Sequence, residues 1–159
     1  MPIGGSSIGF LSGIVSLTTF YEAFGTTVAL ETTQYVTGNK IYVYSSTLDV
    51  PGYQNSRVIV NNTEVLNSAS RGHSMVILNS TGGLVSTASY DTFGVPAALT
   101  SLTTALNGVS SGNIVVLTVF DSSAVNAAIR SAINTGYGST NSNTWSASKI
   151  SHLFIGRKV

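Results

Sequence analysis

The 159-residue chain contains no cysteine, which excludes disulfide bridges, thiolate catalysis and thiolate metal sites. Charged residues make up only 8% of the chain, about a third of the usual share in a soluble domain. With a net charge of +1, the chain lacks the dense Lys and Arg that a nucleic-acid partner requires. No apolar run is long enough to span a membrane, and the first residues lack the pattern of a signal peptide. We therefore expect no nucleic-acid binding and no membrane insertion.

Serine, threonine, asparagine and glycine take the place of the missing charges. The surface is therefore expected to be neutral and rich in hydrogen-bonding groups, as on proteins that face sugars or lie inside assemblies. Apolar β-branched residues occur throughout the chain, which indicates a folded domain rather than a disordered one.

The order of hydrophobic patterns predicts an α+β fold, a mixed β-sheet with short helices packed against it. Thr37-Gly38-Asn39 is expected to form a hairpin turn, Pro96 to begin one helix that Gly108 caps, and Asp121 to Ser123 to cap a second. Strands are predicted over 26–36, 40–45, 57–60, 64–66, 74–78, 84–90, 114–120 and 151–157, and helices over 95–107 and from Val125 through Ala128, Ile129 and Ala132 to about Gly136. Buried positions in the first two of these strands are expected at Val28, Leu30, Tyr35, Ile41, Val43 and Tyr44.

Residues 10–24 fit two patterns. Large apolar residues recur at helical spacing, but alternation from Val15 to Tyr21 suits a strand almost as well. The segment is apolar on more than one face, so it either docks on a neighbouring subunit or packs on its own domain. We expect an N-terminal docking arm over 1–25 and a domain over 26–159.

Arg71 enters a predicted hairpin with a turn at Thr81-Gly82-Gly83, and Asp91 leaves it. Asp91 and Asp121 each follow an apolar strand, where a carboxylate serves a structural role or, as a pair, glycoside hydrolysis. His73 and His152 are able to meet if their strands are neighbours, but two histidines are too few for a zinc site unless carboxylates join them. Nucleophile and phosphate-loop motifs are missing as well, so no enzymatic activity, metal or cofactor is expected.

Four segments, in this order, resemble the interleukin-like EMT inducer (ILEI)/PANDER-type domain, from about residue 55 onward. They are R-G-H-S-M-V-I-L-N from Arg71, S-Y-D-T-F from Ser89, S-G-N-I-V-V-L-T-V-F-D from Ser111, and H-L-F-I-G-R-K from His152. The resemblance implies two β-sheets in a sandwich-like core with two to three short helices. Such domains occur in cytokine-like secreted proteins, in a glycosyltransferase stem and in bacteriophage tail and virion proteins.

The resemblance also implies a carbohydrate site at Arg71, Asp121 and Lys149. The family usually has arginine at the position of Lys149, and lysine lacks the bidentate fork of arginine. Tyr90, Phe93 and Trp145 are candidates for stacking on a sugar, with core packing the favoured role for Phe93.

The missing cysteines and signal peptide favour the bacteriophage branch over the secreted cytokine-like one. We therefore expect a non-enzymatic virion protein of the tail, a fibre or another exposed appendage, assembled in the host cytoplasm. Expected partners are other virion proteins, further copies of the chain and a host surface glycan. The alternative is an architectural decoration, collar or tail-tip subunit without ligand, in which Arg71 and Asp91 form an internal ion pair.

Overall fold

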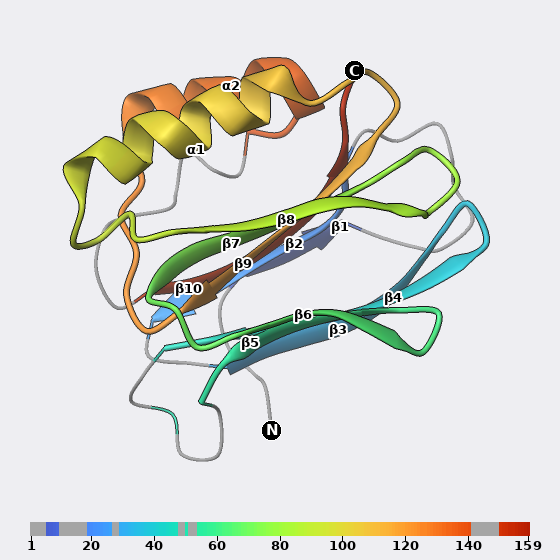
Figure 1. The fold of residues 1–159 in the computed structure, drawn as a ribbon, viewed down its shortest axis with the longest axis horizontal. Coiled ribbons are helices and arrows are strands. Elements are labelled where there is room, and N and C mark those ends of the chain that lie inside the picture. Colours follow the sequence, from blue (N-terminus) through green and yellow to red (C-terminus); the bar gives the residue numbers. More distant parts are fainter. Residues whose placement is uncertain (1–5, 10–18, 27–28, 48–49, 51–53, 141–149) are drawn as a thin grey trace.

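The computed structural model describes residues 6–9, 19–26, 29–47, 50, 54–140 and 150–159. Within these ranges the chain forms ten strands and two helices (Figure 1). The elements are β1 (Ser6–Gly9), β2 (Thr19–Thr26), β3 (Ala29–Val36), β4 (Asn39–Ser46), β5 (Ser56–Val60), β6 (Thr63–Ser68), β7 (Gly72–Leu78), β8 (Leu84–Tyr90), α1 (Pro96–Gly108), β9 (Ile114–Phe120), α2 (Ala127–Tyr137) and β10 (Ile150–Arg157).

The β3–β4 and β5–β6 hairpins turn through the left-handed region of the backbone. Thr37 and Gly38 have φ angles of 49° and 85° between β3 and β4, and Asn61 and Asn62 have 49° and 69° between β5 and β6. Two consecutive positive φ angles match the right-handed twist of the flanking strands, and Asn and Gly adopt them at low cost. The β7–β8 hairpin also forms as predicted, with Gly82 at φ 96° in its turn.

Both predicted helices are confirmed, but two of their predicted caps are wrong. Pro96 begins α1 as expected, whereas Gly108 is its last residue and Val109 follows in an extended conformation. The side chain of Asn126, not Asp121, caps α2 by accepting a hydrogen bond from the Ile129 N–H at 2.9 Å. Residues 121–126 instead form a connection before α2 begins.

All ten strands belong to one mixed hydrogen-bonded network with a nearly closed, barrel-like arrangement. Its path runs β1-β2-β10-β9-β4-β5-β6, with β3 attached to β4, β7 to β9 and β8 to β7. The α+β class is confirmed. The two-sheet sandwich stays a prediction, because β4 and β9 join the two parts of the network through the parallel pair of Ser46 and Phe120.

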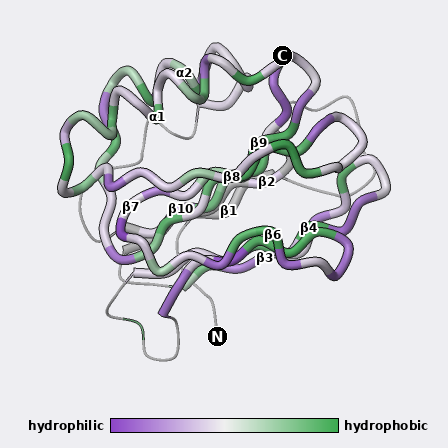
Figure 2. The backbone as a smooth tube through the Cα atoms, viewed as in Figure 1, coloured by the Kyte–Doolittle hydropathy of each residue, from purple (hydrophilic) through white to green (hydrophobic). Residues whose placement is uncertain are grey.

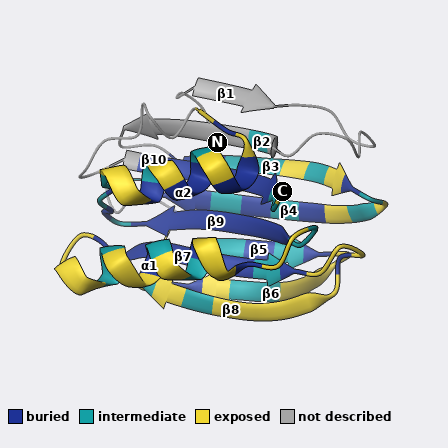
Figure 3. Ribbon diagram, turned by 90° about the horizontal axis from the view of Figure 1, so that it is seen from above, coloured by how far each residue is buried: buried dark blue, intermediate teal, exposed yellow. Residues whose placement is uncertain are grey.

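The central strand β9 divides the core into two clusters. Every residue of β9 is buried, as its unbroken apolar run predicts (Figure 3). Val115 and Leu117 pack under α1 and α2, which lie side by side over one face of the sheet (Figure 1). Ile114 and Val116 point the other way, toward residues of β4 and β5. Figure 2 shows hydrophobic stretches along β9 and β4 and on both helices, and hydrophilic ones at several turns.

A buried hydroxyl joins β4 to the two strands at the centre of the sheet. Ser45 Oγ accepts a hydrogen bond from the Val119 N–H at 3.0 Å and donates one to the His152 carbonyl, also at 3.0 Å. The register that pairs Leu117 with Phe154 would set Val119 opposite His152. The hydroxyl therefore lies where β9 and β10 would otherwise bond each other directly.

The structure decides part of the open question about residues 10–24. Residues 19–26 are a strand, β2, paired antiparallel with β10 on one side and β1 on the other. Residues 10–18 lie outside the described ranges. The division into an arm over 1–25 and a domain over 26–159 stays a prediction, but β2 shares the sheet of the domain.

Of the six positions predicted to be buried in the first two strands, three are confirmed, two are wrong, and Val28 lies outside the described residues. Leu30, Ile41 and Val43 are buried. Tyr35, however, is 47% exposed, and Tyr44 is only partly buried on the outer face of the same sheet. Side chains alternate between the two faces of a strand, so Tyr44 and the buried Val43 beside it lie on opposite faces.

The role of Asn126 can be tested by substitution. Replacing Asn126 with Ala removes the acceptor of the Ile129 N–H and is expected to lower the free energy of unfolding by about 1 kcal/mol in urea denaturation. Asn126→Ser keeps an oxygen acceptor and is expected to stay within about 0.5 kcal/mol of the wild type. Equal stability of the Ala and Ser variants would contradict this assignment of the cap.

Candidate functional site

Arg71 and Asp91 close the open end of the β7–β8 hairpin with a bidentate ion pair. Arg71 Nε donates to Asp91 Oδ1 at 3.0 Å, and Nη2 donates to Oδ2 at 2.7 Å. The two side chains remain 43% and 32% exposed. This geometry fixes the plane of the guanidinium. Of the described residues, Asp91 alone accepts hydrogen bonds from this guanidinium, so its outer N–H groups face solvent.

The turn after β8 is built around the Asp91 carboxylate. Asp91 Oδ1 also accepts the Gly94 N–H at 2.8 Å, and the hydrogen bonds from Arg71 and from this amide hold the pKa of Asp91 below its ordinary value. A Cβ at Gly94 would overlap Arg71 Nη2, so glycine is needed there for the arginine to reach the carboxylate.

The structure brings Asp121 to the same end of the sheet. Gly72 of β7 pairs with Phe120 of β9, and the residues just beyond this pair are Arg71 and Asp121. The hydrogen bonds and charge of Asp91 raise the pKa of Arg71, and the charge of Asp121 raises it further. Two of the three predicted sugar-binding residues, Arg71 and Asp121, are therefore neighbours. The third, Lys149, lies outside the described residues.

Asp121 has an unusual backbone for a residue with a side chain. Its φ is 68°, its N–H donates to the Ser46 carbonyl at 3.1 Å, and its Oδ1 accepts from the Ser122 hydroxyl at 3.1 Å. Aspartate tolerates this left-handed region better than most residues. The backbone turns sharply at this point to leave the central strand, and the carboxylate is partly exposed rather than capping a helix.

Among the candidate stacking residues, Phe93 is the one exposed beside Arg71. Its ring is 46% exposed, and its centroid lies 5.5 Å from the Arg71 guanidinium carbon, within cation–π range. The expectation that Phe93 packs in the core is therefore wrong. Tyr90 is half-buried against the core cluster beneath α1 and α2. Trp145 lies outside the described ranges.

A buried pair of histidines lies close to this end of the sheet. His73 Nε2 and His152 Nε2 are 2.6 Å apart, and His73 Nδ1 lies 2.7 Å from the Thr92 hydroxyl. The rings come from β7 and β10, which flank β9 on either side, and both are fully buried. Burial lowers the pKa of His73 to about 3, and burial together with His73 lowers that of His152. Both rings are therefore neutral in the folded protein at neutral pH, so that one ring N–H donates to the other ring.

The described residues hold few groups suited to catalysis or metal binding. No cluster of three or more His, Cys, Asp or Glu side chains able to hold a metal occurs in them. Asp91 is ionised and bound to Arg71, whereas the acid of a glycosidase needs a raised pKa. None of the helices in these ranges combines the length and apolar character needed to cross a bilayer.

The described residues form an α+β module in which Arg71, Asp91 and Asp121 lie at one end of the sheet. The family model of the interleukin-like EMT inducer matches residues 71–158, more than half of the chain. The chain therefore belongs to the interleukin-like EMT inducer family. No curated protein sequence matches it.

Sequence reasoning missed the parts of the site that depend on close packing. We call the ion pair of Arg71 and Asp91, with the Gly94 N–H that bonds to Asp91, the Arg71–Asp91 clamp. The sequence D-T-F-G at this place indicates only a turn, and it predicts neither the hydrogen bond of the Gly94 N–H nor the exposed ring of Phe93. His73 and His152 do meet, but not as the sequence predicts, because their strands β7 and β10 are not neighbours and the rings meet across β9.

Acid is expected to destabilise the domain through the histidine pair. The folded pKa values lie below the ordinary value of 6.5, so the unfolded chain binds more protons, and stability falls as pH drops below about 6.5. The loss approaches about 1.4 kcal/mol per pH unit for each histidine. Urea denaturation between about pH 7 and about pH 5 measures this loss of stability. The interval is chosen because Asp91 and Glu64, the partner of Arg57, titrate below it.

A double variant, His73→Gln with His152→Gln, removes both titrating rings. Its overall stability is expected to be lower, but its unfolding free energy should be nearly constant over the same pH interval. The slope is the diagnostic quantity, since it does not depend on the starting stability. A slope identical to that of the wild type would disprove the role of the pair.

Proposed function

We propose that this chain is a non-enzymatic component of a bacteriophage virion, in the tail, a fibre or another exposed appendage. Residues 1–25 would attach it to the particle, and residues 26–159 would display an ILEI-like domain that binds host surface carbohydrate. We also propose that the chain belongs to the phage branch of the family and that its domain is a two-sheet sandwich. The ligand site would comprise Arg71, Asp121 and Lys149.

The observation that carries the carbohydrate part is the held guanidinium of Arg71. Asp91 and the turn at Gly94 orient it, Phe93 lies exposed beside it, and its outer N–H groups face solvent. A preoriented arginine loses little side-chain entropy on binding, and a neighbouring aromatic ring offers a face to the C–H groups of a sugar. Asp121 adds an acceptor for sugar hydroxyl groups.

Composition supports the virion part. A chain with 8% charged residues and no cysteine suits a subunit assembled in a reducing cytoplasm, released by lysis and packed among copies and other virion proteins. The family provides the link to tail and virion proteins.

Glycan-array binding by the whole chain tests the ligand site. Arg71→Ala is expected to weaken binding about tenfold to a hundredfold, as for the loss of a charged hydrogen bond, and Arg71→Lys is expected to restore it only in part. Asp121→Asn should also weaken binding while keeping a residue that tolerates the left-handed backbone.

The matched control is Arg57→Ala. Arg57 forms an ion pair of similar exposure with Glu64, with Nη2 and Oε2 2.5 Å apart, on the sheet formed by β4, β5 and β6. Its removal should leave binding unchanged. Binding that is absent from the array, or that responds equally to Arg57→Ala and Arg71→Ala, would refute the site.

The alternative function is purely architectural, a decoration, collar or tail-tip subunit without ligand. The Arg71–Asp91 pair favours it in one respect, because an internal ion pair is itself a sufficient reason for both residues. In an assembled particle this alternative requires neighbouring subunits to cover Arg71 and Phe93, whereas the display proposal requires them to remain accessible.

The attachment role of the N-terminal arm is tested by deleting residues 1–18, which removes β1 but keeps β2 and its pairing with β10. The truncated chain is expected to fold, with a thermal unfolding midpoint lowered by the loss of the β1–β2 pairing, but to be missing from purified particles. Full incorporation of a folded truncated chain would count against the arm as the anchor.

A further inference from the structure

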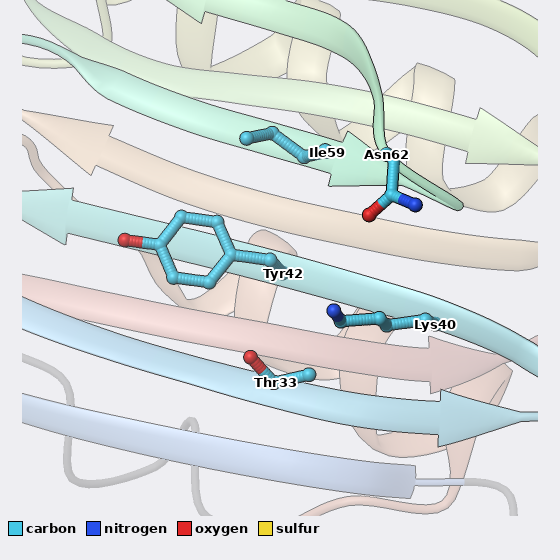
Figure 4. A pocket seen from close by; sticks show the side chains of 5 residues that line it. All are labelled: Thr33, Lys40, Tyr42, Ile59 and Asn62. Atoms are coloured by element: carbon cyan, nitrogen blue, oxygen red, sulfur yellow. The ribbon is translucent and has the colours of Figure 1, made fainter.

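The outer face of the sheet formed by β3, β4 and β5 carries a second candidate site. A shallow cavity of about 200 Å³ opens there, lined by Thr33, Lys40, Tyr42, Ile59 and Asn62 (Figure 4). None of these residues belongs to the segment that matches the family model. The cavity adjoins the β3–β4 and β5–β6 turns, and the Asn39 amide in the first turn donates to the Thr81 carbonyl at 2.7 Å. It therefore lies at the end of the β7–β8 hairpin opposite to Arg71.

Strand register places three of the five lining residues in one row across the sheet. Thr33 pairs with Tyr42, and Tyr42 pairs with Ile59, so the three side chains lie side by side across three strands. Lys40 is two residues before Tyr42 in β4 and shares its face, because side chains in a strand alternate between faces. Figure 4 shows the Lys40 ammonium extending toward Tyr42 and the Asn62 amide directed over the sheet.

The turn that carries Asn62 is fixed by its neighbour. Asn61 Oδ1 accepts the Lys40 N–H at 2.9 Å, the Asn61 N–H donates to the Lys40 carbonyl at 2.8 Å, and Asn61 Nδ2 donates to Asn39 Oδ1 at 2.7 Å. Asn62 follows with φ 69°. One asparagine thus builds the turn, and the exposed amide of the next is left to face the cavity.

Tyr42 offers its ring rather than its hydroxyl. The hydroxyl donates to Glu31 Oε2 at 2.6 Å, and partial burial together with Glu31 raises the pKa of Tyr42 above its ordinary value. Tyr44 contacts the ring edge-on, with centroids 6.2 Å apart. A ring held at two places on a sheet is a rigid stacking surface, and its electron-rich face attracts the C–H groups of a sugar.

Lys40 supplies a positive charge with no acidic partner in the described part of the chain. Arg57 and Arg71 each form an ion pair with a carboxylate, while no carboxylate described here lies within 4 Å of the exposed Lys40 ammonium. Glu31, on this face, accepts the Tyr42 hydroxyl, and Glu64, which lies opposite Ile59, is paired with Arg57. A single cation suits a ligand with one carboxylate per unit, whereas a polyphosphate chain needs many cations.

We propose that this cavity binds one unit of a carboxylated polysaccharide, independently of the site at Arg71. The sugar ring stacks on Tyr42, its carboxylate pairs with Lys40, and its hydroxyl groups bond to Asn62 and Thr33. The ligand class is thus a chain of uronic acids or similar acidic sugars. A neutral glycan fills the same space but leaves the Lys40 ammonium without a counter-charge.

The test is a nuclear magnetic resonance titration of the full chain, labelled with ¹⁵N, at near-physiological salt. The probes are hexasaccharides of galacturonate, mannuronate and hyaluronan, and a neutral galactan of the same length. Saturable shifts are expected at the amides of Lys40, Tyr42 and Asn62 with at least one acidic probe, and weaker ones with the neutral probe. No saturable shift at these amides, or equal affinity for the neutral probe, overturns the proposal.

Variants separate the individual contacts. Lys40→Gln is expected to reduce affinity for the acidic probe about tenfold or more and to abolish its advantage over the neutral probe. Arg57→Gln removes one positive charge from the same sheet face and should change affinity less than about twofold, as for a screened surface charge. Tyr42→Leu should abolish binding, and Tyr42→Phe should largely retain it. Equal effects of Lys40→Gln and Arg57→Gln overturn the proposal, because they indicate attraction to charge alone.

Arg71→Ala distinguishes this site from the one proposed above. The variant is expected to bind the acidic probe as the wild type does, with the same shifts at Lys40 and Tyr42. Loss of these shifts in Arg71→Ala overturns the independent site. Their persistence supports it, even if the glycan array shows no role for Arg71.

Discussion

One buried hydroxyl, that of Ser45, bonds the two parts of the sheet to each other where they meet. It lies between the Val119 N–H and the His152 carbonyl and bonds to both, so it replaces the direct bond that two adjacent antiparallel strands would make. At the next residue, Ser46 pairs with Phe120, and β3 to β6 are thereby connected to the strands beneath the helices. Substitution by Ala would leave two backbone groups without this partner in a dry interior, where each costs about 1–3 kcal/mol.

This connection explains the arrangement at the same end of the sheet. At the same level of the sheet, His73 pairs with Val119 on one side of β9 and His152 lies on the other, and the two rings meet across β9. Beyond Phe120 the backbone turns through the left-handed conformation of Asp121, whose N–H is satisfied by Ser46. This turn of the backbone, directly after the pair of Gly72 and Phe120, places Asp121 beside Arg71. The histidine pair, the turn at Asp121 and the Arg71–Asp91 ion pair thus lie together beside the junction of three strands.

Much of the fold could be predicted from the sequence, because apolar alternation and left-handed turn residues act locally. The β7–β8 hairpin, the buried β9 and both helices are examples. The rest depends on contacts between distant segments. Asp121-Ser122-Ser123 carries a capping signal, yet Asn126 provides the cap. A serine in a strand gives no sign that it joins three strands, and the cavity at Lys40 and Tyr42 requires the register of β3, β4 and β5, which no single segment encodes.

The narrow space beside the Arg71–Asp91 clamp has a consequence for comparing family members. Asp91 lies 20 residues after Arg71, and Gly94 lies three residues after Asp91. Since any side chain at Gly94 would occupy the volume of the guanidinium, the clamp leaves a pattern in the sequence, an R-G pair followed at this spacing by D-x-x-G. A relative that keeps the arginine and the aspartate, but has a larger residue in place of the glycine of D-x-x-G, must hold its arginine in another orientation. The pattern therefore sorts relatives by the geometry of their arginine rather than by its presence.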